Sequence, residues 1–380
     1  MGEETCCGNG RKSCRPEWPP RTGPDPRTHR TRTPPAPRAP TACPGARSKP
    51  HHEVRQAHRT TRGPPVSAPY FALGTIDFGT RLDATASMEL LDRFVERGGQ
   101  WLDTANCYSF WLDPSGTGGQ SETVIGDWLA ARPGIRDRVL ISTKVRQQPT
   151  VPGDWPDSAE GLSAPAIRRG LHESLRRLRT EWIDLYWAHA EDRSVPLEET
   201  VGAFGEVVAD GLARRLGASN HPAWRVERGR AVARELGVTG WTAVQQRYSY
   251  LQPRPGVVLP EDGHMHATEE SLDYVRSEPG MDLWVYSALL WGSYTRAGTD
   301  KPLPEHYEHP GTRRRLAVLR EIVAETGATA NQVVLAWLAG GDPAIVPIVG
   351  VSRTGQLDEA FEAMELRLSE EQRGRLSAAA

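Results

Sequence analysis

Four side chains that can give, take or hold a proton stand where short apolar runs of the sequence end. Asp103, Lys144 and His189 each end or shortly follow such a run, and Tyr108 lies in the loop after the first of them. A carboxylate, an ammonium, an imidazole and a phenol are groups that general acid–base chemistry uses. If the runs lie side by side, the four groups could meet around one substrate. Further polar residues follow the later runs in the same way: Ser219, Asn220, Gln245, Tyr286 and Ser287.

Lys144 is the most informative of the four, because the chain has four lysines and 42 arginines. In such a chain, a generic positive position would be expected to hold arginine. A lysine directly after a buried β-branched run therefore indicates a task that needs a compact charge with an adjustable pKa. The alternative is an ordinary surface lysine. Taken singly, Tyr108, His189 and Asp103 also have ordinary interpretations as loop packing, a structural histidine and a helix cap, so their joint placement is the signal.

The elements that would position these groups alternate between strands and helices from Tyr70 onward. Short β-branched or apolar runs predict strands, and amphipathic stretches predict helices. We expect strands at 71–74, 101–103, 139–143, 183–187, 215–218, 243–245, 283–286 and 344–349. We expect helices at 88–97, 121–131, 166–178, 197–209, 224–236, 269–277, 312–326, 331–338, 356–364 and 369–376. Such alternation is typical of parallel sheets, and eight units predict a closed (β/α)8 TIM barrel with its chemistry at the strands' carboxyl ends.

Residues 1–66 differ in composition from the rest of the chain. They hold 13 of the 31 prolines and 13 of the 46 lysines and arginines, with few large apolar residues. Such a segment cannot bury enough surface to offset its ordering entropy, so we expect a disordered Pro/Arg-rich extension that is dispensable for the barrel at 67–380. One hypothesis is that the native protein starts at Val66, or at Val54, through an alternative codon. The other is a genuine extension with a targeting role.

Charge and cysteine content narrow the function classes. Residues 67–380 carry 33 basic and 43 acidic side chains, a formal charge of −10, which disfavours nucleic acid and anionic membrane as partners. No apolar run is long enough to span a membrane, and the N-terminus lacks the apolar region of a signal peptide. Only Cys107 lies in this part, which fits a cytoplasmic protein without disulfides. Cys6, Cys7 and Cys14 lack zinc-finger spacing, so neither a metal module nor a basic nucleic-acid arm is favoured for residues 1–66.

Five motifs, in order along the chain, resemble those of one enzyme family. Residues 103–108 resemble D-T-A-x-x-Y, and residues 119–126 resemble G-x-S-E-x-x-x-G. Residues 184–189 are similar to D-L-x-x-x-H, and residues 217–220 to G-x-S-N. Residues 347–350 with Gln356 resemble a cofactor-phosphate segment. Over about residues 70–380 the chain thus resembles the aldo-keto reductases, which implies reduction of an aldehyde or ketone to an alcohol with NADPH.

The resemblance implies a role for each of the four residues. Tyr108 would be the general acid that protonates the carbonyl oxygen as hydride arrives. Lys144, held and kept charged by Asp103, would lower the phenol's pKa from its ordinary value of about 10. His189 would hydrogen-bond the substrate oxygen and stabilise the developing alkoxide, while nicotinamide carries the hydride.

The resemblance also implies contacts to NADP or NADPH. Tyr286 would stack on the nicotinamide, and Ser219, Asn220 and Gln245 would bind its carboxamide. The 2′-phosphate would meet Ser352 and Arg353. The expected cofactor residues are Gly74, Thr75, Ser219, Asn220, Gln245, Tyr286, Ser287, Leu289, Gly292, Ser352, Arg353 and Gln356. In one departure from the pattern, the family often has asparagine near the adenine where Ala360 stands.

Two loops are expected to wall the substrate pocket, because the chain ends soon after the helix at 369–376. The loop 109–118 contributes Phe110 and Trp111, and the loop 290–310 contributes Trp291 and Tyr294. These aromatics suggest a fairly open, apolar pocket for a small-molecule carbonyl substrate but do not name that substrate, with ordinary rim packing as the alternative. We expect a monomer or small homo-oligomer. A non-catalytic, cofactor-sensing regulatory subunit of the aldo-keto type is the main alternative function, since it could keep the same four residues.

Overall fold

The computed structural model describes residues 70–258, 263–295 and 303–379. The chain divides into two units, 1–62 and 63–380, and every described residue belongs to the second. The extension that we expected to be disordered, 1–66, lies outside the described residues. The fold reported below is therefore that of the second unit.

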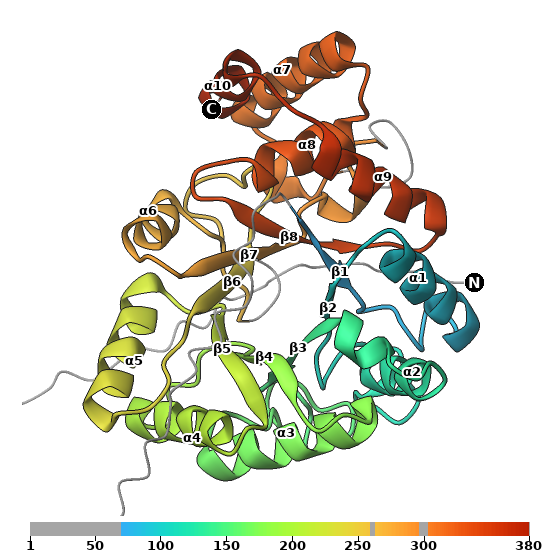
Figure 1. Ribbon diagram of the computed structural model, residues 1–380. Helices are drawn as coiled ribbons and strands as arrows, with labels where there is room; N and C mark the ends of the chain where they lie inside the picture. Colours follow the sequence, from blue (N-terminus) through green and yellow to red (C-terminus); the bar gives the residue numbers. More distant parts are fainter. Residues whose placement is uncertain (1–69, 259–262, 296–302, 380) are drawn as a thin grey trace, which may run out of the picture. The chain divides into compact units, whose positions relative to one another are not determined.

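Eight parallel strands close into a barrel with helices around it (Figure 1). Each strand pairs with the next one along the chain, and β1 closes the ring against β8, where Leu73 faces Val349. This architecture confirms the predicted (β/α)8 barrel. The strands are β1 (Ala72–Gly74), β2 (Trp101–Asp103), β3 (Leu140–Val145), β4 (Ile183–Ala188), β5 (Ala213–Ser219), β6 (Ala243–Arg247), β7 (Asp282–Tyr286) and β8 (Ile345–Gly350).

All ten predicted helices are present, and their ends differ from the predicted ends by a few residues. Helix α1 begins at Ala84 rather than at residue 88, because the Asp83 carboxylate accepts the Ala86 backbone N–H at 2.8 Å and caps it. The helices are α1 (Ala84–Glu96), α2 (Gln120–Ala130), α3 (Ala164–Leu178), α4 (Leu197–Ala209), α5 (Ala223–Leu236), α6 (Glu269–Ser277), α7 (Pro310–Thr326), α8 (Ala330–Ala339), α9 (Thr354–Glu365) and α10 (Glu370–Ala378).

Several strands run further than their apolar runs predicted, and the extensions of β3 and β6 each add a basic residue. β3 continues through Lys144 to Val145, which pairs with Ala188 of β4. β6 continues to Arg247, which pairs with Tyr286 of β7. Both extensions place a basic side chain inside a strand, because backbone pairing with the next strand along the chain continues past the apolar residues.

Three tryptophans fill the interior of the barrel. The ring centroid of Trp284 lies 5.0 Å from that of Trp101 and 5.6 Å from that of Trp187. Gly217 on β5 makes room for them, since a Cβ there would lie 2.2 Å from the Trp187 ring. The barrel is therefore a packed core and not a pore, as is usual for this architecture.

A larger apolar core lies between the strands and the surrounding helices. Leu91, Ile167, Phe204 and Leu335 contribute to it from four different helices, and all are fully buried. Among the residues that the structure describes, no helix is long and apolar enough to cross a membrane. The same part of the chain holds no group of three acidic, histidine or cysteine side chains arranged to bind a metal ion.

Candidate active site

The predicted site residues lie directly above the tryptophan layer. Side chains alternate along a strand, so residues two apart share a face. Trp101 precedes Asp103 by two residues on β2, and Trp187 precedes His189 by two residues at the end of β4. The same spacing separates the tryptophan and the tyrosine of β7. The tryptophans therefore form the floor of a site at the carboxyl ends of the strands.

Lys144 is the centre of the predicted group. Its Nζ donates to Asp103 Oδ2 at 2.6 Å, to Tyr108 OH at 2.5 Å and to the Thr104 carbonyl at 2.7 Å. These three bonds use all the donors of an ammonium group. The side chains of Lys144 and Asp103 are both 0% exposed, so water does not compete for the ion pair. Asp103 is fixed in turn by the Ser142 hydroxyl, which donates to Oδ1 at 2.7 Å.

The Tyr108 phenol departs from the expectation of a lowered pKa. Burial raises the pKa of Tyr108 well above its ordinary value, and the Asp103 carboxylate raises it further. Burial also lowers the pKa of Lys144, although Asp103 opposes this shift. Both directions follow from the cost of charge in a site that excludes water. The phenol is therefore held protonated, with its oxygen against Lys144 and its O–H 3.3 Å from Asp103 Oδ2.

His189 faces Tyr108 from the neighbouring part of the rim. The two ring centroids are 6.0 Å apart with the rings edge to face. The His189 backbone N–H donates to the Val145 carbonyl at 3.0 Å, and its Nδ1 lies 3.6 Å from Cys107 Sγ. Burial lowers the pKa of His189 well below its ordinary value, and the charge of Lys144 lowers it further. The imidazole is therefore neutral and can hydrogen-bond without adding a charge.

The four residues differ in what they present to the outside. Asp103 and Lys144 are completely buried, whereas Tyr108 and His189 are partly exposed. The phenol and the imidazole are thus the two groups that a bound molecule could touch. The carboxylate and the ammonium act on them from beneath.

The residues predicted to bind the carboxamide lie around the same rim. Ser219, Asn220 and Gln245 are buried on β5 and β6 or directly after them. Gln245 Nε2 lies 3.3 Å from Asp103 Oδ1, and the Tyr286 hydroxyl donates to Asn220 Oδ1 at 2.7 Å. Asn220 has a left-handed backbone with φ of 55°, which asparagine tolerates better than most residues. The structure thus brings this predicted set next to the four central residues.

Two further predicted cofactor residues, Gly74 and Thr75, lie at the end of β1 and directly after it. The Thr75 side chain is not accessible to a ligand. Its hydroxyl donates to the Asp103 carbonyl at 3.0 Å and lies 2.8 Å from Ser121 Oγ, and the side chain is 0% exposed. Thr75 therefore supports the backbone of Asp103. Gly74 is partly exposed and tightly packed, since a Cβ there would lie 2.9 Å from a methyl of Ile348. The partly exposed turn after β7 carries the others: Ser287, Leu289 and Gly292.

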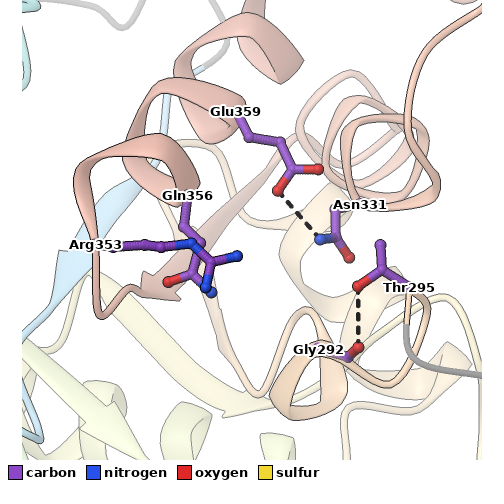
Figure 2. A pocket seen from close by; sticks show the side chains of 6 residues that line it. All are labelled: Gly292, Thr295, Asn331, Arg353, Gln356 and Glu359. Carbon is purple, nitrogen blue, oxygen red and sulfur yellow. Dashed lines mark hydrogen bonds between the residues drawn. The ribbon is translucent and has the colours of Figure 1, made fainter. Parts of the chain in front are cut away.

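A cavity of about 230 Å³ is lined by two of the residues predicted to lie near the cofactor phosphate, Arg353 and Gln356, whereas Ser352 does not line it (Figure 2). Arg353 precedes helix α9, Gln356 lies in its first turn, and both side chains reach into the cavity. The Ser352 backbone N–H donates to Gln356 Oε1 at 2.8 Å, which leaves the Gln356 amide nitrogen as a donor. A guanidinium and an amide donor at a helix N-terminus suit a phosphate group. The donor set of this cavity therefore fits the phosphate of a dinucleotide.

The aromatics predicted to wall a substrate pocket divide into two kinds. Trp111 and Trp291 are about half exposed, at 52% and 54%. Phe110 and Trp111 line a second cavity of about 450 Å³ between the loops after β2 and β3. Tyr294 is buried, and its hydroxyl accepts the Leu251 backbone N–H at 2.8 Å. Tyr294 thus packs beneath its loop.

The segment after β3 was missed by the sequence analysis. Pro149 and Ala159 form an antiparallel bridge, so the chain folds back on itself between them. Trp155, from the tip, lies 6.1 Å from the Phe110 ring and adds a wall next to the second cavity. The Glu160 carboxylate is partly buried and accepts a hydrogen bond from the Asn106 amide at 2.7 Å, which ties this segment to the loop after β2. Pro- and Gly-rich sequence without periodicity gives no signal for such a hairpin.

Comparison with known proteins shows that the chain is similar to known oxidoreductases. A model of the aldo/keto reductase family matches residues 71–380. A norsolorinic acid reductase of Emericella nidulans is 31% identical, over 79% of this chain and 75% of that protein. An NADP(+) aryl-alcohol dehydrogenase of Phanerodontia chrysosporium is 28% identical, over 77% and 75%. A solved structure, the thermostable aldo-keto reductase Tm1743 with the inhibitor epalrestat, superposes with a TM-score of 0.61 at 27% identity, covering 82% of this chain and 95% of that one.

Proposed function

The chain belongs to the aldo/keto reductase family of oxidoreductases acting on carbonyl groups, and we propose that it reduces an aldehyde or ketone with NADPH. The observation that carries this proposal is the buried Lys144 ammonium, which bonds Asp103 and Tyr108 at once. That arrangement supports a phenol as proton donor next to a neutral imidazole. The alternative of a non-catalytic regulatory subunit predicts cofactor binding without turnover.

Tyr108 is the proton donor in this proposal. Its raised pKa keeps the phenol protonated until a substrate is present. Lys144 then acts when the proton leaves, because an ammonium 2.5 Å from the oxygen stabilises the phenolate as it forms. Asp103 keeps the ammonium charged although burial opposes that charge. The phenol hydrogen must turn from Asp103 toward the cleft for the transfer to occur.

His189 orients the substrate. A neutral imidazole can donate one hydrogen bond to a carbonyl oxygen without stabilising a competing anion. The imidazole is neutral in the working range because burial lowers its pKa. Its edge-to-face position 6.0 Å from the Tyr108 ring lets both groups reach one oxygen.

The proposed cofactor, NADPH, would bind at two groups of residues, one around the nicotinamide and one around the 2′-phosphate. Bound nicotinamide would supply the hydride to the carbonyl carbon. Ser219, Asn220 and Gln245 would hold its carboxamide, and Tyr286 would pack against its ring. Arg353 would bind the 2′-phosphate that distinguishes NADPH from NADH, and the NADP(+) named for the fungal relative supports this choice. The remaining proposed contacts are Gly74, Ser287, Leu289, Gly292, Ser352 and Gln356, whereas the completely buried Thr75 supports the Asp103 backbone.

We propose an aromatic carbonyl compound as the substrate class. Among the described residues, six of the eight exposed large apolar side chains lie in segments that follow strands, at the same end of the barrel as the site, and we call them the apolar rim. The apolar rim consists of Ile76, Trp111, Leu112, Val151, Val258 and Trp291. An apolar mouth favours a large flat substrate over a small polar one, and the names of the aryl-alcohol and norsolorinic acid enzymes agree. The free thiol of Cys107 suits the reducing cytoplasm, where we propose that the enzyme works.

A panel assay tests the proposal. Oxidation of NADPH is measured with aryl aldehydes, aryl ketones and aliphatic aldehydes, and the same panel is repeated with NADH. We expect turnover with NADPH and the highest kcat/KM for aryl compounds. Tight NADPH binding without turnover of any carbonyl would refute the catalytic proposal and favour the regulatory alternative. Equal kcat/KM for aryl and aliphatic aldehydes of similar size would refute the substrate class alone.

A further inference from the structure

The cavity at the N-terminus of α9 presents different chemistry on its two sides. Arg353 and the Gln356 amide nitrogen offer hydrogen-bond donors on one side (Figure 2). Glu359 from α9 and Asn331 from the first turn of α8 lie together on the other side. Glu359 can only accept hydrogen bonds when it is ionised. A ligand that fills this cavity must therefore carry an anionic group at one end and N–H donors at the other.

The Asn331 side chain has a fixed orientation. Its Nδ2 donates to Glu359 Oε2 at 3.2 Å, and the other carboxylate oxygen accepts the Thr329 hydroxyl at 2.6 Å. A carboxylate cannot form a hydrogen bond with the amide oxygen, so the atom next to Glu359 is the Asn331 amide nitrogen Nδ2. Asn331 Oδ1 is therefore an acceptor that faces away from Glu359.

This oxygen has no hydrogen-bond partner among the described residues. Asn331 is only 8% exposed, and Oδ1 is buried without a donor. Buried acceptors without a partner are rare in folded proteins and are costly when they occur. The side chain also lines the cavity. A donor supplied by a bound ligand would remove the cost.

An adenosine with a phosphate on its ribose has both features that the cavity requires. The phosphate matches Arg353, and the exocyclic amino group of adenine is an N–H donor. Ala360 is 1% exposed on α9 and offers no polar atom to a base. We propose that Asn331 Oδ1 accepts a hydrogen bond from the adenine amino group of the cofactor. This inference rests on the proposed function, because it assigns one residue of the proposed NADPH site.

The test compares NADPH with its hypoxanthine analogue, deamino-NADPH, in which a carbonyl replaces the amino group. Dissociation constants are measured by fluorescence titration without carbonyl substrate, so that turnover does not enter. We expect the wild-type protein to bind the analogue about 3- to 10-fold more weakly, the worth of one hydrogen bond. Asn331→Ala should bind NADPH more weakly by a similar factor. It should also no longer distinguish the two dinucleotides.

Arg353→Ala is the matched control from the same cavity. It should weaken binding of both dinucleotides equally and keep their ratio, because it removes a phosphate contact only. The inference is overturned if Asn331→Ala keeps the wild-type ratio, or if the wild-type protein binds both dinucleotides equally. If Asn331→Ala does not fold, the nearly isosteric Asn331→Leu is measured in its place, and it too should no longer distinguish the two dinucleotides. Absence of NADPH binding by the wild-type protein would overturn the proposed function together with this inference, whereas equal affinities would overturn the inference alone.

Discussion

Replacing Lys144 by methionine removes the one positive charge that Asp103 contacts. The Asp103 carboxylate would stay completely buried, with the Ser142 hydroxyl at 2.7 Å and the Tyr108 hydroxyl and Gln245 Nε2, both at 3.3 Å, as its remaining close donors. Breaking a buried ion pair by removing one partner typically costs about 3–5 kcal/mol of stability. We expect Lys144→Met to lose that amount in free energy of unfolding, and carbonyl reduction to fall about 10²–10⁴-fold with the lost phenolate stabilisation.

Lys144→Arg keeps the charge and should fail almost as badly in turnover. The ammonium directs three bonds to Asp103, Tyr108 and the Thr104 carbonyl within 2.7 Å. A planar guanidinium is larger and cannot reproduce that arrangement. Overfilling a packed site also lowers the free energy of unfolding by about 1–3 kcal/mol. The charge alone is therefore not sufficient.

A double variant tests whether the stability lost in Lys144→Met comes from the unpaired Asp103 carboxylate. In Lys144→Met with Asp103→Asn, no unpaired carboxylate remains, so the free energy of unfolding should recover by about 2 kcal/mol relative to Lys144→Met. Denaturant unfolding and steady-state NADPH oxidation are measured on all three proteins. Turnover by the arginine variant within tenfold of wild type would refute the reasoning about Lys144, as would a double variant no more stable than Lys144→Met.

Three further predictions address single groups. Tyr108→Phe should leave the fold and NADPH affinity unchanged and lower carbonyl reduction about 10²–10⁴-fold; near wild-type turnover would exclude the phenol as donor. Arg353→Ala should weaken NADPH binding while NADH binding hardly changes, and equal losses in a titration of both cofactors would show that Arg353 does not bind the 2′-phosphate. The pKa of buried His221 is lowered to about 4, so its contribution to stability is present above the unfolded pKa of about 6.5 and lost as pH falls toward 4. Urea unfolding between pH 7 and 5 should therefore show a smaller acid-induced loss for His221→Asn than for wild type, and equal losses would contradict the shift.

The order of strands and helices was predictable because each element carries its own local signal. Apolar runs such as 139–143 indicate buried strands, and amphipathic stretches such as 166–178 indicate helices. Helix starts were less predictable, as at α1, where Asp83 caps a first turn with little apolar content. The end of β3 was missed for a related reason, since a buried lysine looks like the end of an apolar run.

The four central residues were also predictable, because strand ends converge in a barrel. Their electrostatics were not, since the Tyr108 pKa depends on how completely the phenol is buried next to Asp103. Asn331 gave no sequence signal beyond its place in a helix. Its importance arises from the packing of α8 against α9, which leaves Oδ1 without a donor beside the cavity.

Lys144 has a practical consequence for chemical modification of the protein. It is the only lysine among the described residues, and its Nζ is enclosed by three acceptors. The chain's other lysines, Lys12, Lys49 and Lys301, lie outside the described residues, so arginine supplies the positive charge on the described barrel surface. Reagents that acylate amines, such as succinimidyl esters, would therefore find no target on that surface. Dyes or resins coupled through amines would therefore leave the described surface of the barrel unmodified.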